Sequence, residues 1–153
     1  MKLDVAKRTE IARRPSDVYR FIATDHGRNH PRWDAWATDF RQIDPGPVAV
    51  GTRFAYKRKA FGPLRQRLQL VVTEMEADRR FGFSFSGSTK ASVTYTLEPF
   101  GEAGTLVEFA GRFEVPGPQF LAGLMKGSVD RQLSDGQRRI KQLLESSGLN
   151  SAA

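Results

Sequence analysis

The sequence predicts an α+β fold in which a curved antiparallel sheet of about seven strands wraps around one long C-terminal helix, with two short helices after the first strand. Two patterns predict this order. Between residues 38 and 113, apolar residues recur with a period of two and short turns separate the runs, which is typical of antiparallel neighbours. From Pro118 to about Glu145 the period becomes helical.

The first 47 residues contain the short helices. Pro15 suits the first turn of a helix, and Asp25-His26-Gly27 is expected to interrupt the helical segment. Asp44-Pro45-Gly46-Pro47 is a strong breaker. We therefore expect a strand at 3–11, helices at 15–24 and 28–33, and a strand at 38–44.

Five further strands follow the breaker. Their aromatic and aliphatic residues alternate with small, polar or basic ones, so that one face of each strand is apolar. Phe61-Gly62-Pro63 is expected to form a turn between the first two. The expected strands are 51–59, 64–75, 81–86, 92–97 and 105–113.

The final helix has an unusual inner face. Its apolar stripe contains Leu121, Met125, Val129, Leu133, Ile140, Leu143 and Leu144. Ser128, Gln132 and Gly136 fall inside that stripe, although glycine within a helix costs about 1 kcal/mol relative to alanine. Small residues suit a helix that roofs a cavity better than one that closes a solid core. We expect one domain at 1–146 and a flexible tail at 147–153.

Composition narrows the class of protein. The chain has 153 residues, 39% of them hydrophobic, which is enough for one domain with a real core. Cysteine is absent, which excludes disulfides and thiolate chemistry. The first residues lack the apolar run of a signal peptide, and no segment approaches the roughly 18 apolar residues of a membrane span. We therefore expect a cytoplasmic protein.

Several stretches together resemble a known family. They are Ile11 to Ile22 with its Pro15-Ser16-Asp17-Val18 step, His30-Pro31-Arg32-Trp33, Val50-Gly51-Thr52-Arg53-Phe54, Val72-Thr73-Glu74 with Arg79-Arg80-Phe81, and Tyr95 to Pro99 with Gly104-Thr105. Their order over 3–146 resembles the helix-grip fold of the START-like (SRPBCC) superfamily, in particular its polyketide cyclase/dehydrase subgroup. The resemblance implies that the chain binds a hydrophobic small molecule, such as a lipid, a polyketide or another aromatic metabolite.

A set of aromatic and aliphatic residues is predicted to line a cavity between the sheet and the final helix. It consists of Trp33, Phe54, Tyr56, Phe83, Tyr95, Phe109, Phe113, Leu121, Met125 and Val129. Arg58 shares the face of Phe54 and Tyr56, so it is placed at the cavity mouth, where it can pair with a ligand carboxylate. The alternative is that these aromatic residues form an ordinary filled core.

Catalysis by an acid or base in the cavity is the second hypothesis. Its weak candidates are Glu74 and His30, and the enzyme would be a cofactor-independent cyclase or dehydratase. Asp34 is also considered, since burial in an apolar cavity would raise the pKa of a carboxyl. Glu74 can equally mark the solvated end of its strand. No metal site is expected from His26 and His30, and no nucleotide or phosphate motif is present, so no cofactor is expected.

The net charge of +7 raises a third hypothesis, an interaction protein. Basic residues cluster in two adjacent strands, with Phe61 at the turn between them: Arg53, Lys57, Arg58, Lys59, Arg65 and Arg67. Alternation places Arg53, Lys57, Arg65 and Arg67 on the outer face of the sheet. Such a face can bind nucleic acid, dock weakly on an anionic membrane, or simply be solvated. Nucleic acid is not expected as a partner, and the oligomeric state is left open.

Overall fold

The computed structural model describes residues 1–59 and 65–151. Seven strands form one antiparallel sheet in the order β1-β7-β6-β5-β4-β3-β2. The strands are β1 (Lys2–Ile11), β2 (Ala37–Gln42), β3 (Arg53–Lys59), β4 (Arg65–Glu76), β5 (Arg80–Gly87), β6 (Lys90–Phe100) and β7 (Gly104–Glu114). The predicted turn at Phe61-Gly62-Pro63 lies outside the described residues.

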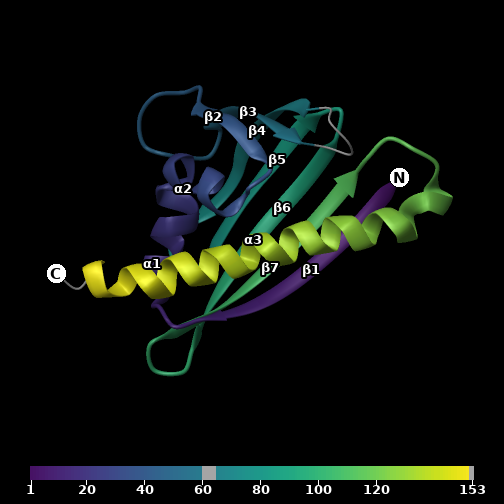
Figure 1. The fold of residues 1–153 in the computed structure, drawn as a ribbon. Coiled ribbons are helices and arrows are strands. Elements are labelled where there is room, and N and C mark those ends of the chain that lie inside the picture. Colours follow the sequence, from purple (N-terminus) through teal and green to yellow (C-terminus); the bar gives the residue numbers. More distant parts are fainter. Residues whose placement is uncertain (60–64, 152–153) are drawn as a thin grey trace.

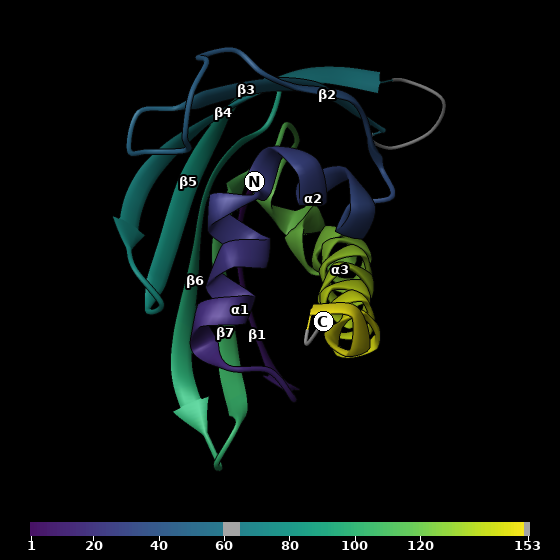
Figure 2. The same cartoon turned by 90° about the vertical axis from the view of Figure 1, so that its left-hand side faces the viewer.

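Helices occupy one side of this sheet. The sheet curves around α3 (Ala122–Ser151), which follows the 3-10 turn η2 (Gln119–Leu121) (Figures 1 and 2). The other part of the concave side is covered by α1 (Pro15–Tyr19), the π-helical turn η1 (Arg20–Thr24) and α2 (His26–Trp33). The predicted fold class is confirmed. Helix α3 includes residues 147–151, and the flexibility of the 147–153 tail stays a prediction.

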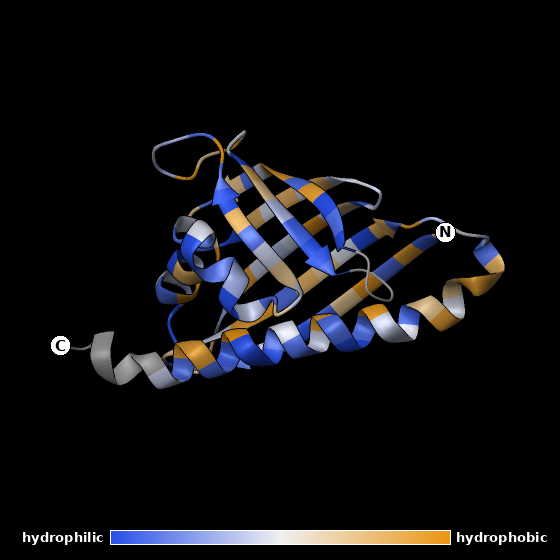
Figure 3. Ribbon diagram, turned by 45° about the horizontal axis from the view of Figure 1, so that its top comes forward, coloured by the Kyte–Doolittle hydropathy of each residue, from blue (hydrophilic) through white to orange (hydrophobic). Residues whose placement is uncertain are grey.

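Strand alternation decides which side chains face inwards. On β3, Phe54 and Tyr56 are buried while Arg53 and Lys59 are exposed. On β7, every second residue from Val107 to Phe113 is buried and faces inwards. Hydropathy alternates along the strands in the same way (Figure 3). The concave face is therefore apolar and the convex face polar.

Helix α3 is buried unevenly along its length. Near its C-terminal half, Ile140 is fully buried and Leu144 is 5% exposed. Leu133 and Val129 are only partly buried, and Leu121 at the start of the helical segment is 37% exposed. The helix is thus fixed to the core at one end and covers the sheet more loosely at the other.

The junction between η1 and α2 differs from the prediction. Gly27 is predicted to break the helical segment, but it lies inside α2, where the Phe54 ring packs against it. The break falls at Asp25, which has φ −100° and ψ 30°. Because Gly27 leaves room for the Phe54 ring, α2 packs close to β3. His26 and His30 consequently stand one turn apart on the same buried face.

Substitution of Gly111 tests how the concave face is built. A Cβ at Gly111 would lie 2.7 Å from Phe113 Cε2 and 3.1 Å from Phe109 Cε1, so the glycine lets both rings lie across it. Gly111→Ala is expected to lower the free energy of unfolding by about 1–3 kcal/mol through overpacking. Denaturant titration measures this.

The matched control is Gly127→Ala, where an added Cβ meets nothing within 4 Å. This helical substitution is expected to raise stability by up to about 1 kcal/mol. Equal effects of the two changes would contradict the packing of Phe109 and Phe113 over Gly111.

Candidate ligand-binding site

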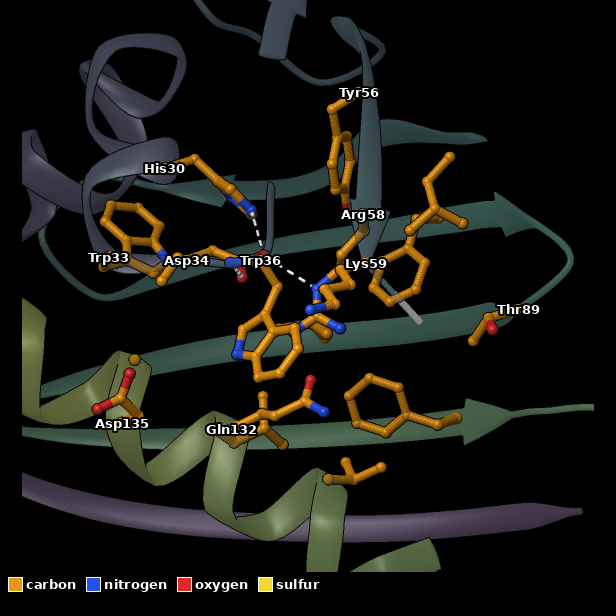
Figure 4. A pocket seen from close by; sticks show the side chains of 18 of the residues that line it. His30, Trp33, Asp34, Trp36, Tyr56, Arg58, Lys59, Thr89, Gln132 and Asp135 are labelled. Atoms are coloured by element: carbon orange, nitrogen blue, oxygen red, sulfur yellow. Dashed lines mark hydrogen bonds and ion pairs between the residues drawn. The ribbon is translucent and has the colours of Figure 1, made fainter. Parts of the chain in front are cut away.

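A cavity of about 120 Å³ lies between the concave face of the sheet, α2 and α3. Most of its wall is aromatic or aliphatic: Trp33, Trp36, Tyr56, Leu68, Phe83, Phe85, Val93, Tyr95, Phe109, Phe113, Val115, Val129 and Leu133. Polar side chains line it too, several of them labelled in Figure 4: His30, Asp34, Arg58, Lys59, Gln66, Thr89, Gln132, Asp135 and Gln137. An apolar cavity of about 150 Å³ takes up benzene in another protein, so the enclosed space here holds roughly one aromatic ring, and a larger ligand extends through the open side of the cavity.

Most of the residues predicted from the sequence lie around this cavity. They are Trp33, Tyr56, Phe83, Tyr95, Phe109, Phe113 and Val129, together with Arg58 and His30. Of the three residues that interrupt the apolar stripe, Gln132 and Gly136 line the cavity and Ser128 does not. Gly136 therefore leaves space beneath the helix.

Four predicted residues lie elsewhere. Phe54 is fully buried against the His26 and Phe40 rings, and Met125 packs at the edge of the core. Leu121 lies exposed before α3 begins. Glu74 forms an ion pair with Arg80, 3.0 Å between Oε1 and Nε, and does not contribute to the cavity wall.

Two histidines form a hydrogen-bonded chain into the cavity. His26 Nδ1 lies 2.9 Å from the Ile22 carbonyl oxygen, and His26 Nε2 lies 3.1 Å from His30 Nδ1. The Ile22 carbonyl belongs to η1, where the change of helical geometry frees carbonyl oxygens for side chains. Asn29 Nδ2 donates in the same way to the Phe21 carbonyl at 3.0 Å.

The hydrogen bonds of these two histidines fix which ring nitrogens carry a hydrogen. A carbonyl oxygen can only accept, so His26 Nδ1 must carry a hydrogen. Burial, followed by the charge of His30, lowers the pKa of His26 well below its usual range, so its Nε2 is an unprotonated acceptor. His30 Nδ1 therefore donates to His26 Nε2.

His30 Nε2 faces an ionised carboxylate. It lies 3.4 Å from Asp34 Oδ2, and a hydrogen bond from His30 helps to lower the pKa of Asp34 (Figure 4). Asp34 Oδ2 accepts a hydrogen bond from Arg58 Nε at 3.1 Å, and Asp34 Oδ1 accepts one from the Trp36 amide at 3.1 Å (Figure 4). The Arg58 guanidinium is thus already paired with a carboxylate of this chain.

The prediction of a raised pKa for Asp34 is wrong. Burial does raise the pKa of this carboxyl, but the neighbouring His30 imidazole and the Arg58 guanidinium outweigh burial and hold it well below its usual range. Asp34 is therefore a permanent anion rather than a proton donor. Sequence reasoning missed this because Arg58 reaches Asp34 only through the pairing of β3 with β2.

The opposite wall carries a second polar pair. Burial, followed by the charge of Asp34, raises the pKa of the Tyr95 phenol, and a hydrogen bond with Gln137 only partly offsets this. Burial likewise raises the pKa of Tyr56. Gln137 is 6% exposed, and its Oε1 has no hydrogen-bond partner among the described residues.

Sequence reasoning did not identify Gln137, Trp36 or the role of His26. Trp36 and Gln137 carry no motif, and only the fold brings them to the cavity. The four-residue spacing of His26 and His30 is visible in the sequence, but the expected break at Gly27 places the two histidines in separate segments. A helix continuing through Gly27 would have placed both imidazoles on one face.

The basic hairpin is partly neutralised by nearby groups. Arg53 pairs with Asp44 at 2.9 Å, Lys57 with Asp39 at 3.4 Å, and Arg65 donates to Thr38 Oγ1 at 2.8 Å.

Within the described residues, no helix is both long and apolar enough to cross a membrane.

Comparison with known families agrees with this architecture. The family model described as "Polyketide cyclase / dehydrase and lipid transport" matches residues 2–145. The chain therefore belongs to this family, and its predicted place in the START-like superfamily is confirmed. No curated protein sequence matches the chain.

Solved structures share the fold at low sequence identity. Ara h 8.0201 has a TM-score of 0.74 at 11% identity over 95% of this chain and 99% of its own. TTHA0849 from Thermus thermophilus has a TM-score of 0.67 at 21% identity, covering 90% and 97%. Norcoclaurine synthase from Thalictrum flavum, in complex with dopamine and hydroxybenzaldehyde, has a TM-score of 0.69 at 14% identity, covering 94% and 87%.

The buried histidine chain makes stability depend on pH. Because the folded-state pKa of His26 is lowered, below about pH 6.5 the unfolded chain binds a proton that the folded chain does not. The free energy of unfolding is therefore expected to have its full value above pH 6.5 and to fall by up to about 1.4 kcal/mol per pH unit below it. Loss of the Asp34 contribution follows separately below about pH 3.9, where unfolded carboxyls protonate.

Denaturant titrations at several pH values measure this change in the free energy of unfolding. His26→Leu is the control: it removes the imidazole that binds the proton, so the free energy of unfolding should depend less on pH. An unfolding free energy that rises as the pH falls from 6.5 to 5 would contradict a neutral buried His26.

Proposed function

We propose that the protein binds a hydrophobic small molecule, of the lipid, polyketide or aromatic metabolite class, in the cavity beneath α3. The observation that carries this proposal is the cavity itself, most of whose wall is aromatic or aliphatic and which also has polar groups that can orient a ligand. The family description, which names polyketide cyclases and lipid transport, supports the same class of ligand. The loosely packed first half of α3 supports it further, since ligand entry requires part of the wall to move.

Filling the cavity tests the proposal. Val129→Trp places an indole on the α3 wall and is expected to weaken binding of a fluorescent fatty acid or a flavonoid at least about tenfold. Leu124→Trp adds the same side chain to an exposed position of the same helix and should leave binding unchanged. Fluorescence titration measures affinity, and thermal unfolding verifies that both variants fold. Equal binding by the two variants would place the ligand outside this cavity.

A cofactor-independent cyclase or dehydratase is the second candidate function. The observation that favours it is His30, which lines the cavity and whose Nε2 lies 3.4 Å from the Asp34 anion, itself paired with the Arg58 cation. Such a nitrogen is a suitable general base for a proton next to a carbonyl, and the adjacent carboxylate stabilises the imidazolium that forms. Glu74, the other candidate, pairs with Arg80 away from the cavity wall.

A comparison of two variants tests the enzyme hypothesis. With a linear poly-β-ketone substrate, His30→Leu is expected to lower the rate of cyclisation by about 10²–10⁴-fold, the usual contribution of a positioned general base. Glu74→Gln is expected to retain the wild-type rate. Chromatography of the cyclised product measures both. A wild-type rate in His30→Leu would remove His30 from any mechanism.

A further inference from the structure

Both carboxylates that line the cavity are already paired with groups of this chain. Asp34 accepts hydrogen bonds at both oxygens, one from Arg58 Nε and one from the Trp36 amide. Asp135 also accepts one at each oxygen, from two arginines of α3. The wall, as far as the structure describes it, therefore offers a ligand no unpaired negative charge.

The two cations of the wall, Arg58 and Lys59, are paired less completely. Arg58 donates to Asp34 through Nε, and its two terminal nitrogens, Nη1 and Nη2, have no acceptor among the described residues. Lys59 Nζ likewise has no acceptor there. The Arg58 side chain is 22% exposed and Lys59 is exposed, so both cations lie at the open side of the cavity, where a ligand can reach them. The unused hydrogen-bonding capacity of the charged wall is thus cationic.

Trp36 holds these two cations in place. Its carbonyl oxygen accepts a hydrogen bond from the Lys59 amide at 3.0 Å, and the centre of its ring lies 5.7 Å from Lys59 Nζ, which is within the range of a cation–π interaction (Figure 4). Its amide donates to the carboxylate that binds Arg58. Because both cations are ordered before a ligand arrives, less conformational entropy is lost when it binds.

A carboxylate fits this arrangement better than other polar groups. Its two oxygens can accept at the same time from the free edge of the guanidinium and from the ammonium. With Arg58 and Lys59 against the single anion Asp34, this side of the cavity has a net positive charge that one carboxylate balances. A phosphate group, with a charge of about −1.5 to −2, would exceed it.

We propose that Arg58 and Lys59 bind the carboxylate of an amphipathic ligand whose apolar body lies in the cavity beneath α3. This inference rests on the proposed function and adds to it the polar group that the ligand carries. It narrows the ligand to fatty acids and aromatic carboxylates. The contact of Arg58 Nε with Asp34 leaves its other two nitrogens for the ligand, and Lys59 supplies the second cation.

A matched pair of probes tests the inference: para-toluate and para-toluamide, which have the same ring and nearly the same shape but differ in charge. At about pH 8 and low ionic strength, the wild-type protein is expected to bind the carboxylate about tenfold more tightly than the amide, because charge-assisted hydrogen bonds at a partly exposed site supply a ratio of this order. NMR titration to millimolar concentrations measures both dissociation constants. Added salt should reduce the ratio.

Variants of the same strand assign the effect to particular cations. Lys59→Gln is expected to weaken binding of toluate about two- to fivefold and to leave the affinity for the amide unchanged. Lys57→Gln is the matched control, since Lys57 pairs with Asp39 and does not line the cavity, and it should leave both affinities unchanged. The double variant Arg58→Gln/Lys59→Gln should bring the ratio to about one. Glutamine keeps an N–H donor for Asp34, and thermal unfolding verifies that each variant folds.

The outcomes separate this inference from the proposed function. Equal binding of toluate and toluamide by the wild type would overturn the inference and leave cavity binding intact. An equal loss of toluate affinity in Lys57→Gln and Lys59→Gln would overturn it too, because only the overall positive charge of the protein would then attract the anion. Val129→Trp, which fills the cavity, should weaken both probes alike, and toluate binding that survives this change would place the anion elsewhere. If neither probe binds to the wild type, the proposed function fails for aromatic ligands and the inference fails with it.

Discussion

The concave face of the sheet carries more apolar surface than one helix can cover, and the rest of the molecule depends on this mismatch. Helix α3 closes the sheet well only where Ile140 and Leu144 are buried. Towards its start the helix presents Gln132 and Gly136, and space remains beneath it. The uncovered aromatic face is then the wall of a cavity, because hydrophobic side chains there have no protein partner across the gap.

The elements α1, η1 and α2 cover the other part of the concave face and bring polar groups to this cavity. The change from α- to π-helical geometry leaves the Phe21 and Ile22 carbonyls to side chains of α2. Asn29 satisfies one and His26 the other, so a local feature of the backbone sets the protonation of a side chain. The effect reaches the cavity one helical turn later, at His30. A buried polar chain of this kind is costly unless each member has a partner, and at His30 the partner is the Asp34 carboxylate, 3.4 Å from Nε2.

Asp34 illustrates how a second charge changes the chemistry of the site. Alone in an apolar cavity it would be a weak acid, ready to donate a proton. Beside Arg58 it is an anion whose two oxygens are occupied. Arg58 donates to Asp34 through Nε, and Lys59 and Asp135 add one further charge of each sign to the cavity wall.

The sequence by itself determined the order of the elements and the face of each strand that turns inwards. Alternation with a period of two placed Tyr56, Phe83, Tyr95, Phe109 and Phe113 on the concave side, because side-chain direction in a strand is a local property. The small residues of α3 likewise indicated a space beneath the helix. Only the tertiary structure decided how the polar groups meet. Arg58 with Asp34, and Gln137 with Tyr95, are joined by strand pairing and helix docking over long sequence separations. The protonation of His30 depends in turn on the carbonyl of Ile22, through His26. Such electrostatic properties depend on distances between groups, and residue type and periodicity do not contain those distances.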